Sequence, residues 1–458
     1  MNFNTYFTKK NINKSYEEIK KGRLTTGIDR ISRRKFEKNK QAYFDIIYRK
    51  INNNSYKFTK YKQILAIKDE YNKPRIISIP TIRDKIVLNI IRQILDDTYK
   101  NIIRNDSVSN IIKKIAIDIK NYDYCFTLDI SNFYGMINHN ILMHKLRNNT
   151  KSNKLHNIID LAITTQTVNI EASSKKEFDL INDIGIPQGV SISNLLANIY
   201  LMDFDDKHYN HTQYSYFRYV DDIIVFCHKN KSKAIRQKMI NELTNNRTYA
   251  LKINAKKCTY NEIFKNTFIE FLGYRIYYNS CISIKDMSIK KFEKSLEKIF
   301  HDYINSKEKH IKGNKEYLKW KLNLKITGCV RNNIQYGWVK YYKLCDKDEV
   351  FYKLDWLIVN LIKRFKLGKF LLSGNNKYIG KKFSKTYYEI KHNNSSLTNS
   401  KYIPNIDNYS IEKKCNILSS VCKRKIDTWS HNQINYEFDK FIFKSIRELE
   451  QDLQGIYG

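Results

Sequence analysis

Two short apolar runs near the N-terminus are separated by a polar segment. The runs cover residues 63–67 and 75–79, and the polar turn between them extends from Lys68 to Pro74. Strand-length apolar runs flanked by turn residues are typical of a β-hairpin. Because Lys and Arg are frequent in this segment, the pattern predicts a hairpin with a basic turn.

Two further apolar segments are interrupted or ended by acids. Residues 124–129 predict a buried strand that ends at Asp129. Residues 216–226 hold two apolar runs around Asp221 and Asp222. This second segment therefore predicts a hairpin with both carboxylates at its tip.

Apolar residues with helical spacing occupy much of the remaining chain. Residues 82–95 carry the apolar stripe of an amphipathic helix, and residues 289–303 place their large apolar side chains on one face. Helices are also predicted over 354–365 and within 406–458. Residues 367–401 mix Gly, Ser and Asn with many Lys and predict a boundary between structural parts.

Composition adds the class of binding partner. The 458 residues are 42% hydrophobic and 13% aromatic, which excludes a mainly disordered chain, and their formal charge is +36. That charge is +14 over residues 1–100, only +3 over 101–250 and +19 over 251–458. A nearly neutral middle between two basic flanks indicates a catalytic region flanked by phosphate-binding parts, with nucleic acid as the partner.

Other site classes are not indicated. The eight Cys contain no C-x-x-C pair, and the ten His show no metal-ligand spacing, so no zinc site is predicted. The N-terminus lacks the apolar core of a signal peptide, and no apolar run approaches the about 20 residues needed to cross a bilayer. We expect a cytoplasmic protein with no membrane association.

Asp129, Asp221 and Asp222 are the candidate catalytic residues because each follows or interrupts an apolar strand pattern. Carboxylates are hard ligands suited to Mg²⁺, and two ions about 3.5–4 Å apart can hold the attacking and leaving oxygens of a phosphoryl transfer. A lone Asp-Asp pair is more often a solvated turn. The motifs around the three acids favour the catalytic interpretation.

In sequence order, these motifs resemble the reverse transcriptase family over about residues 22–285. Each motif alone is weak, but six in order at ordinary spacing are specific. They are KDEYNKPRIISIPTIRD at 68–84, LDISNFY at 128–134, GIPQG at 185–189 followed by Ser193, Leu196, Ala197 and Asn198, YVDD at 219–222, LKINAKK at 251–257, and FLGY at 271–274.

The resemblance implies an α+β fold of the right-hand polymerase type. Such a fold has fingers, a palm built on an antiparallel sheet with helices, and an α-helical thumb, here followed by a mostly helical C-terminal extension. The implied domains are an N-terminal segment and fingers at 1–120, a palm at 121–285 with a fingers insertion around 140–185, a thumb at 286–366, and a basic C-terminal extension at 367–458.

The resemblance also implies a metal site and its ligands. Asp129 and Asp221 are expected to be the principal ligands of two Mg²⁺ ions, for which Mn²⁺ is a substitute. Asp222 is expected to support them, and Ile130 to offer its backbone carbonyl to a metal. Lys257 matches the lysine that protonates the departing pyrophosphate, although Lys256 beside it is an alternative.

Further residues match positions that bind dNTP or primer. Lys68 and Arg75 match the residues that hold the triphosphate, and Tyr134 matches the steric gate that excludes a 2′-hydroxyl. Ordinary core packing is the alternative for Tyr134. Gln188 and Gly189 are expected to lie against the nascent base pair. The predicted primer grip, for which plain strand core is the alternative, comprises Phe271, Leu272, Gly273 and Tyr274.

The implied function is that of an RNA-directed DNA polymerase. Its expected partners are an RNA template, dNTPs and the DNA product. Assembly of several copies of the chain into a homo-oligomer is left open. Ser131-Asn132 and Val190-Ser191 differ from the residues usual in intron-type and retron enzymes, although the chain shares features with both. The chain looks more like bacterial reverse transcriptases of the defence-associated "unknown group", which implies a cognate non-coding RNA and a role in anti-phage defence.

Alternatives remain at two levels. For the whole chain they are an intron-type maturase or RNA-binding protein, and a protein-primed or untemplated DNA polymerase. For residues 377–391, where Lys alternates with aromatic residues, they are a nucleic-acid-binding segment and a solvated amphipathic helix.

Overall fold

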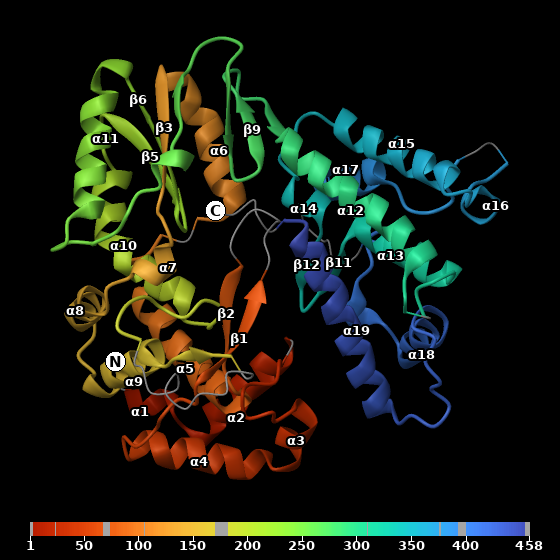
Figure 1. The fold of residues 1–458 in the computed structure, drawn as a ribbon, viewed down its shortest axis with the longest axis horizontal. Helices are drawn as coiled ribbons and strands as arrows, with labels where there is room; N and C mark the ends of the chain where they lie inside the picture. Colours follow the sequence, from red (N-terminus) through yellow and green to blue (C-terminus); the bar gives the residue numbers. More distant parts are fainter. Residues whose placement is uncertain are drawn as a thin grey trace. The chain divides into compact units, whose positions relative to one another are not determined.

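The computed structural model describes residues 3–22, 24–66, 74–104, 106–169, 182–308, 310–374, 377–392 and 400–453. The chain divides into two compact units, Met1–Lys265 and Asn266–Tyr457 (Figure 1). Helices and strands are mixed in both units, and the predicted α+β class is confirmed. The predicted four-part division into domains stays a prediction.

A four-stranded antiparallel sheet forms the centre of the first unit. Its strand order is β5-β6-β3-β7, so β3, which comes first in the chain, is flanked by strands that come later. Helices α6 and α10 pack against β5, and α11 packs against β3. The elements are β3 (Tyr124–Asp129), β5 (Tyr214–Tyr219), β6 (Asp222–Cys227), β7 (Tyr260–Glu262), α6 (Val108–Asp118), α10 (Ser193–Tyr209) and α11 (Lys229–Thr244).

The predicted N-terminal hairpin is also confirmed. Strands β1 (Tyr61–Ala66) and β2 (Arg75–Ile79) pair antiparallel, and β4 (Thr167–Val168) adds to β1 in parallel. Helix α5 (Ile82–Tyr99) follows directly, and the Thr81 hydroxyl caps it by accepting a hydrogen bond from the Asp84 backbone N–H.

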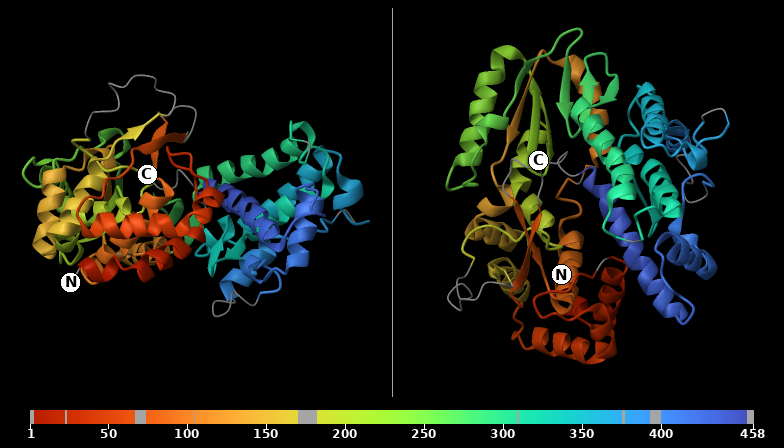
Figure 2. Two further views of the ribbon diagram at one scale, coloured as in Figure 1. Left: turned by 90° about the horizontal axis from the view of Figure 1, so that it is seen from below. Right: turned by 45° about the vertical axis from the view of Figure 1, so that its right-hand side comes forward.

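The remaining helices of this unit complete its core. Helices α1, α2 and α4 contact α5, while α3 contacts α4 (Figure 2). Their apolar faces join one buried cluster with the inner residues of the sheets. These helices are α1 (Phe3–Tyr6), α2 (Lys9–Lys20), α3 (Arg33–Lys38), α4 (Lys40–Asn52), α7 (Phe133–Met136), α8 (His139–Asn149), α9 (Asn153–Thr164), and the 3₁₀ turns η1 (Ile119–Asn121) and η3 (Ala255–Lys257).

The second unit is mainly helical. It begins with a small antiparallel sheet of order β10-β9-β8 and contains one further hairpin, β11-β12. Its strands are β8 (Phe268–Phe271), β9 (Tyr274–Tyr277), β10 (Ile282–Ile284), β11 (Cys329–Arg331) and β12 (Ile334–Tyr336). Its helices are α12 (Asp286–Asn305), α13 (Lys315–Thr327), α14 (Trp338–Tyr341), α15 (Glu349–Arg364), α16 (Gly368–Leu371), α17 (Phe383–His392), η5 (Ile406–Asn408), α18 (Ile411–Asn416), the π-helical turn η6 (Ile417–Val421) and α19 (His431–Gln451).

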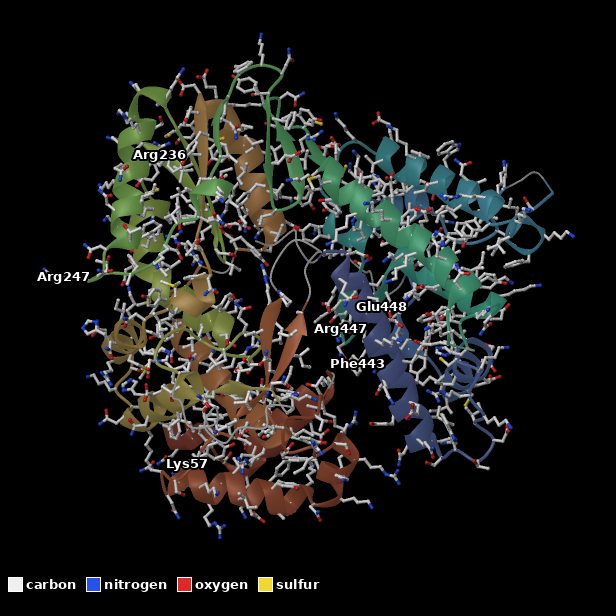
Figure 3. The ribbon with its side chains drawn as sticks, viewed as in Figure 1. Lys57, Arg236, Arg247, Phe443, Arg447 and Glu448 are labelled. Carbon is white, nitrogen blue, oxygen red and sulfur yellow. The ribbon has the colours of Figure 1, made fainter. Side chains whose placement is uncertain are left out.

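Helix α17, which lies within the predicted boundary over residues 367–401, packs against other helices of the second unit. Phe351 of α15 stacks on Tyr387 of α17 with ring centroids 4.2 Å apart. Glu448 of α19 forms an ion pair with Lys321 of α13 in the same unit (Figure 3). Amphipathic spacing in a Lys-rich segment is enough to form a packed helix, which the polar composition obscured. No helix among the described residues is long and apolar enough to span a membrane.

Candidate active site

The hairpin β5–β6 ends in a two-residue turn that carries an acid. Tyr219 pairs with Asp222 across the hairpin, which leaves Val220 and Asp221 as the turn. Val220 has a φ of 57°, a left-handed conformation that is strained for a β-branched residue. Arg218 stabilises this backbone because its Nη1 donates a hydrogen bond of 2.7 Å to the Val220 carbonyl.

The end of strand β3 is tied to this turn. Asp129 lies directly opposite Asp222 in the ladder between β3 and β6. One residue further, the backbone N–H of Ile130 donates to the carbonyl of Asp221 at 3.3 Å. The sheet therefore brings together acids from segments about ninety residues apart in sequence, as the motifs predicted.

The three predicted acids lie at adjoining positions, since Asp129 pairs with Asp222 and Asp221 directly precedes Asp222. Among the described residues, no three His, Cys, Asp or Glu side chains are grouped to hold a metal ion. Burial raises the pKa of Asp221, a backbone hydrogen bond opposes this effect, and the charge of Asp129 raises the pKa further, so these two carboxylates interact as an acid pair. Asp222 lies opposite Asp129 in the ladder between β3 and β6, and its expected role as a supporting ligand stays a prediction.

Two cations oppose the charge of this pair. Asp129 is only 6% exposed, and its Oδ1 accepts a hydrogen bond of 3.2 Å from Lys257 Nζ. Arg75 and Lys257 act to lower the pKa of Asp221, against the larger effect of burial. Arg75 comes from strand β2 and Lys257 from η3, so separate segments supply cations to one place.

The backbone explains why Lys257 reaches Asp129. Ile253 forms an isolated bridge with Ile130, and the N–H of Asn254 donates to the carbonyl of Asp129 at 2.9 Å. The turn η3 therefore starts beside the end of β3. As a result Lys257, which the motif favoured over its neighbour, forms the ion pair with Asp129.

Tyr134 lies beside the same charges. Burial raises the pKa of its phenol to about 12, with Asp221 raising it further and Arg218 and Arg75 opposing. Its hydroxyl donates a long hydrogen bond of 3.4 Å to Asn194 Oδ1. The predicted gate residue is thus next to the acid pair and is partly buried, as both its functional and its packing interpretation require.

The loop with Gln188 and Gly189 docks on the strand that carries Arg75. The N–H of Ser78 on β2 donates to the carbonyl of Gln188 at 2.7 Å. Gly189 has a φ of +92°, and a Cβ there would lie 2.7 Å from the Cγ2 of Ile77. Only glycine allows both this backbone conformation and this close approach.

The remaining predicted groups are Lys68 and the primer grip. Lys68 is outside the described residues. The primer-grip segment belongs to the second unit, where Leu272 and Gly273 form the turn between β8 and β9 with φ of 47° and 78°. The side chains of Phe271, Leu272 and Tyr274 are buried there.

The sequence patterns did not predict the ion pair that stabilises the turn between β5 and β6. The Arg218 guanidinium is buried and forms a two-pronged ion pair with Asp205 of α10, with an Nε–Oδ1 distance of 2.7 Å. The Tyr216 hydroxyl donates to the same carboxylate at 2.8 Å. An arginine inside an otherwise apolar and aromatic strand was the available signal, since such a charge must find a buried partner.

Comparison with known proteins gives a match to one family model and to one curated relative. The family model described as "Reverse transcriptase (RNA-dependent DNA polymerase)" matches residues 67–276. A curated relative, "Uncharacterized 91 kDa protein in cob intron" from Schizosaccharomyces pombe, is 25% identical over 170 residues, which is 35% of this chain. The match spans only 20% of that relative's length.

Solved telomerase structures show a distant likeness. Apo telomerase from Candida tropicalis matches 86% of this chain and 68% of its own, at 14% identity and a TM-score of 0.42. A form of it truncated from the C-terminal domain matches 50% of this chain and 55% of its own, at 16% identity and a TM-score of 0.41. Telomerase from Candida albicans in complex with a fragment of telomeric RNA matches 72% and 63%, at 12% identity and a TM-score of 0.41.

Proposed function

We propose that this chain, whose residues 67–276 match the reverse transcriptase family model, extends a primer 3′ end with dNTPs on an RNA template. The observation that carries the proposal is the convergence of Asp129, Asp221, Arg75 and Lys257. Paired acids flanked by cations suit a reaction in which charged phosphates are bound and displaced.

The residues at this site fit a divalent cation. Two close carboxylates, one of them with a pKa raised by burial and by the other, form an anionic pair that a cation would stabilise. Mg²⁺ is commonly held by one or two carboxylates together with substrate phosphates, so Asp129 and Asp221 suffice as protein ligands. When bound, such ions would lower the charge on the phosphates and activate the attacking oxygen.

The chain's own residues have distinct roles in the proposed step. The primer 3′-oxygen loses its proton and bonds to the α-phosphorus, while the bond from that phosphorus to the bridging oxygen breaks and pyrophosphate leaves. Arg75 would bind the triphosphate, and Lys257 would supply a proton to the departing pyrophosphate. Tyr134 would contact the sugar, and Gln188 and Gly189 the nascent base pair.

A direct test is DNA synthesis by the purified full chain. We would supply a primed RNA template, the four dNTPs and either Mg²⁺ or Mn²⁺, and resolve the extended primer by electrophoresis. Asp221→Ala is the matched inactive control. If the wild-type chain adds no nucleotide to primed RNA, to primed DNA or to co-purified RNA, the polymerase proposal is wrong.

A second candidate function, an intron-type maturase, is favoured by the S. pombe relative, whose name places it in an intron. Under this proposal the chain would bind and fold a catalytic RNA, and DNA synthesis would be secondary. Splicing of an RNA encoded around the gene, measured with the wild-type and Asp221→Ala chains, separates the two. A maturase keeps its splicing effect in the Asp221→Ala variant.

We also propose a biological setting from the motif departures at Ser131-Asn132 and Val190-Ser191. In this proposal the enzyme acts in the cytoplasm of a bacterium, copies a cognate non-coding RNA and contributes to anti-phage defence. Plating phages on cells that express the wild-type or Asp221→Ala chain with its native flanking DNA tests the proposal. Equal plaque counts for both strains across a broad phage panel would contradict it.

A further inference from the structure

A pocket of about 420 Å³ lies within the second unit, and none of the elements that carry the acid pair contributes to it. Helix α13 contributes Trp320 and Asn323 to its wall, the segment before α17 contributes Lys381, and the segment leading to η5 contributes Tyr402. Helix α18 contributes Lys413. Its volume is in the range of about 300–1,000 Å³ that is usual for small-ligand pockets.

The lysines of this pocket are placed by aromatic rings rather than by acids. Lys381 Nζ lies 4.1 Å and the nearby Lys385 Nζ 4.7 Å from the centre of the Tyr402 ring. Lys413 Nζ lies 3.8 Å from the centre of the Tyr409 ring. Cation–π contacts hold an ammonium in place without neutralising its charge.

The lack of acidic partners distinguishes these lysines within the same unit. Among the ion pairs of the described ranges in this unit, none involves Lys381, Lys385 or Lys413. By contrast, Lys391 on α17 reaches the carboxylate of Asp346 at 4.0 Å.

Repulsion between two of these lysines also favours the binding of an anion. Burial lowers the pKa of Lys381, the charge of Lys385 lowers it further, and the charge of Glu389 opposes both effects. Two ammonium groups are thus held close together without an ion pair to either of them. A bound anion would relieve their repulsion.

The rest of the wall suits a planar polar group. Asn323 Oδ1 accepts a hydrogen bond of 2.9 Å from the Lys381 backbone N–H, which fixes the orientation of this amide. The Tyr402 hydroxyl accepts one of 2.6 Å from the Lys382 backbone N–H, which fixes that ring. Oriented amides and immobilised rings are the groups that read base edges and contact base faces.

We propose that this pocket binds an unpaired nucleotide of an RNA strand, with its phosphates on Lys381 and Lys413 and its base against the aromatic and amide wall. The proposal rests on the proposed function, because a polymerase that copies RNA must also hold the part of the strand that is not being copied. Bases within a duplex are stacked and covered, so a pocket of this kind selects single-stranded RNA.

Binding of a 5′-fluorescein-labelled 12-nucleotide oligouridylate to the full chain tests the proposal. We expect Lys381→Gln/Lys413→Gln to raise the Kd about tenfold or more by fluorescence anisotropy. The slope of log K against log salt should fall by about 1.4, since each phosphate of a single strand that a lysine neutralises contributes about 0.7. The control Lys353→Gln/Lys363→Gln removes two exposed lysines of α15 and should change the Kd less than about twofold.

Photo-crosslinking locates the strand independently. An oligouridylate with 4-thiouridine should crosslink to peptides that contain Tyr402 or Tyr409. Equal loss of affinity in the pocket and control variants, crosslinks only at other peptides, or displacement of the RNA by free UTP at equal concentration would each overturn the proposal. DNA synthesis is measured separately, so RNA binding at the pocket in a chain without polymerase activity would contradict the proposed function and leave the pocket standing.

Discussion

The two hairpins that carry sequence motifs, β5–β6 and β8–β9, have turns of the same length, but the side chains of the two turns have different surroundings. Val220 and Asp221 at the end of β5–β6 place an acid beside Asp129 and Lys257, at a cost in backbone strain and electrostatic repulsion. The turn of β8–β9 also has left-handed backbone, but its apolar side chains are buried. Under the proposed function, the first hairpin carries catalytic residues, whereas the second is held by a core of buried side chains.

This difference shows where free energy is lost and recovered. The acidic turn is destabilising by itself, since a buried carboxylate lies next to another and a valine adopts a left-handed conformation. The buried ion pair between Arg218 and Asp205 offsets this destabilisation of the turn. The apolar turn needs no such support because its side chains join a core. Functional and structural hairpins should therefore respond differently to substitution.

The largest expected effect is that of Asp221→Ala on DNA synthesis. Removing half of the acid pair should lower kcat on a primed template by at least about 10⁴-fold, which corresponds to ~5.5 kcal/mol. The free energy of unfolding should stay the same or rise, because the buried charge that Asp129 repels is gone. A variant that keeps its activity, or that loses activity by unfolding in a urea titration, would contradict this view of the turn.

The next largest effect should come from the support beneath the turn. Arg218→Met leaves the Asp205 carboxylate buried without its cation, which should lower the free energy of unfolding by about 3–5 kcal/mol. Arg218→Lys keeps the charge but loses the two-pronged geometry, so a smaller loss is expected. Urea titrations of the three chains provide the measurement. A loss below about 1 kcal/mol for Arg218→Met would mean that the turn does not depend on this pair.

The acidic hairpin could be predicted from the sequence because its apolar runs and the positions of its acids both indicate where the strands end. Period-2 apolar runs fix the strands, and an acid at the end of such a run must sit at a sheet end. Strand β3 was predicted with the bounds that it has, Tyr124–Asp129. The pairing of Asp129 with Asp222 depended on motif order, since no local pattern specifies which strands become neighbours.

Other features could not be read from the chain. The pocket beside Tyr402 combines segments spread between residues 320 and 442, and such convergence leaves no periodic signal. The contribution of α17 to the second unit was hidden by its many lysines, although Phe383 and Tyr387 on the same helix are buried. The expected role of Asp222 stays a prediction, because its place opposite Asp129 does not by itself make it a metal ligand.

A pH prediction concerns the base of the acidic hairpin. His208 is buried, and its Nδ1 lies 2.6 Å from the Tyr214 hydroxyl at the start of β5. Burial lowers the pKa of His208 from 6.5 to about 4. The charge of Glu242 opposes this shift, and the charge of Lys207 adds to it. As the pH falls, His208 is therefore protonated at a higher pH in the unfolded chain than in the folded chain. Stability should be lost as pH falls from 6.5 toward 4, with about 2 kcal/mol lost between pH 7 and pH 5. Urea titrations at both pH values should show a smaller difference for His208→Gln, and equal differences would contradict the assignment.

The smallest effect should come from the structural hairpin, where Tyr274→Phe removes one hydroxyl. That hydroxyl donates to the Tyr341 carbonyl, while the Tyr341 hydroxyl donates to the Leu272 carbonyl at 2.8 Å. Loss of one such hydrogen bond should lower the free energy of unfolding by about 1 kcal/mol. Because the hydroxyl is engaged within the unit, the KM for primed template should not change. A raised KM at unchanged stability would show instead that this side chain contacts the primer, and the second hairpin would then display chemistry as the first one does.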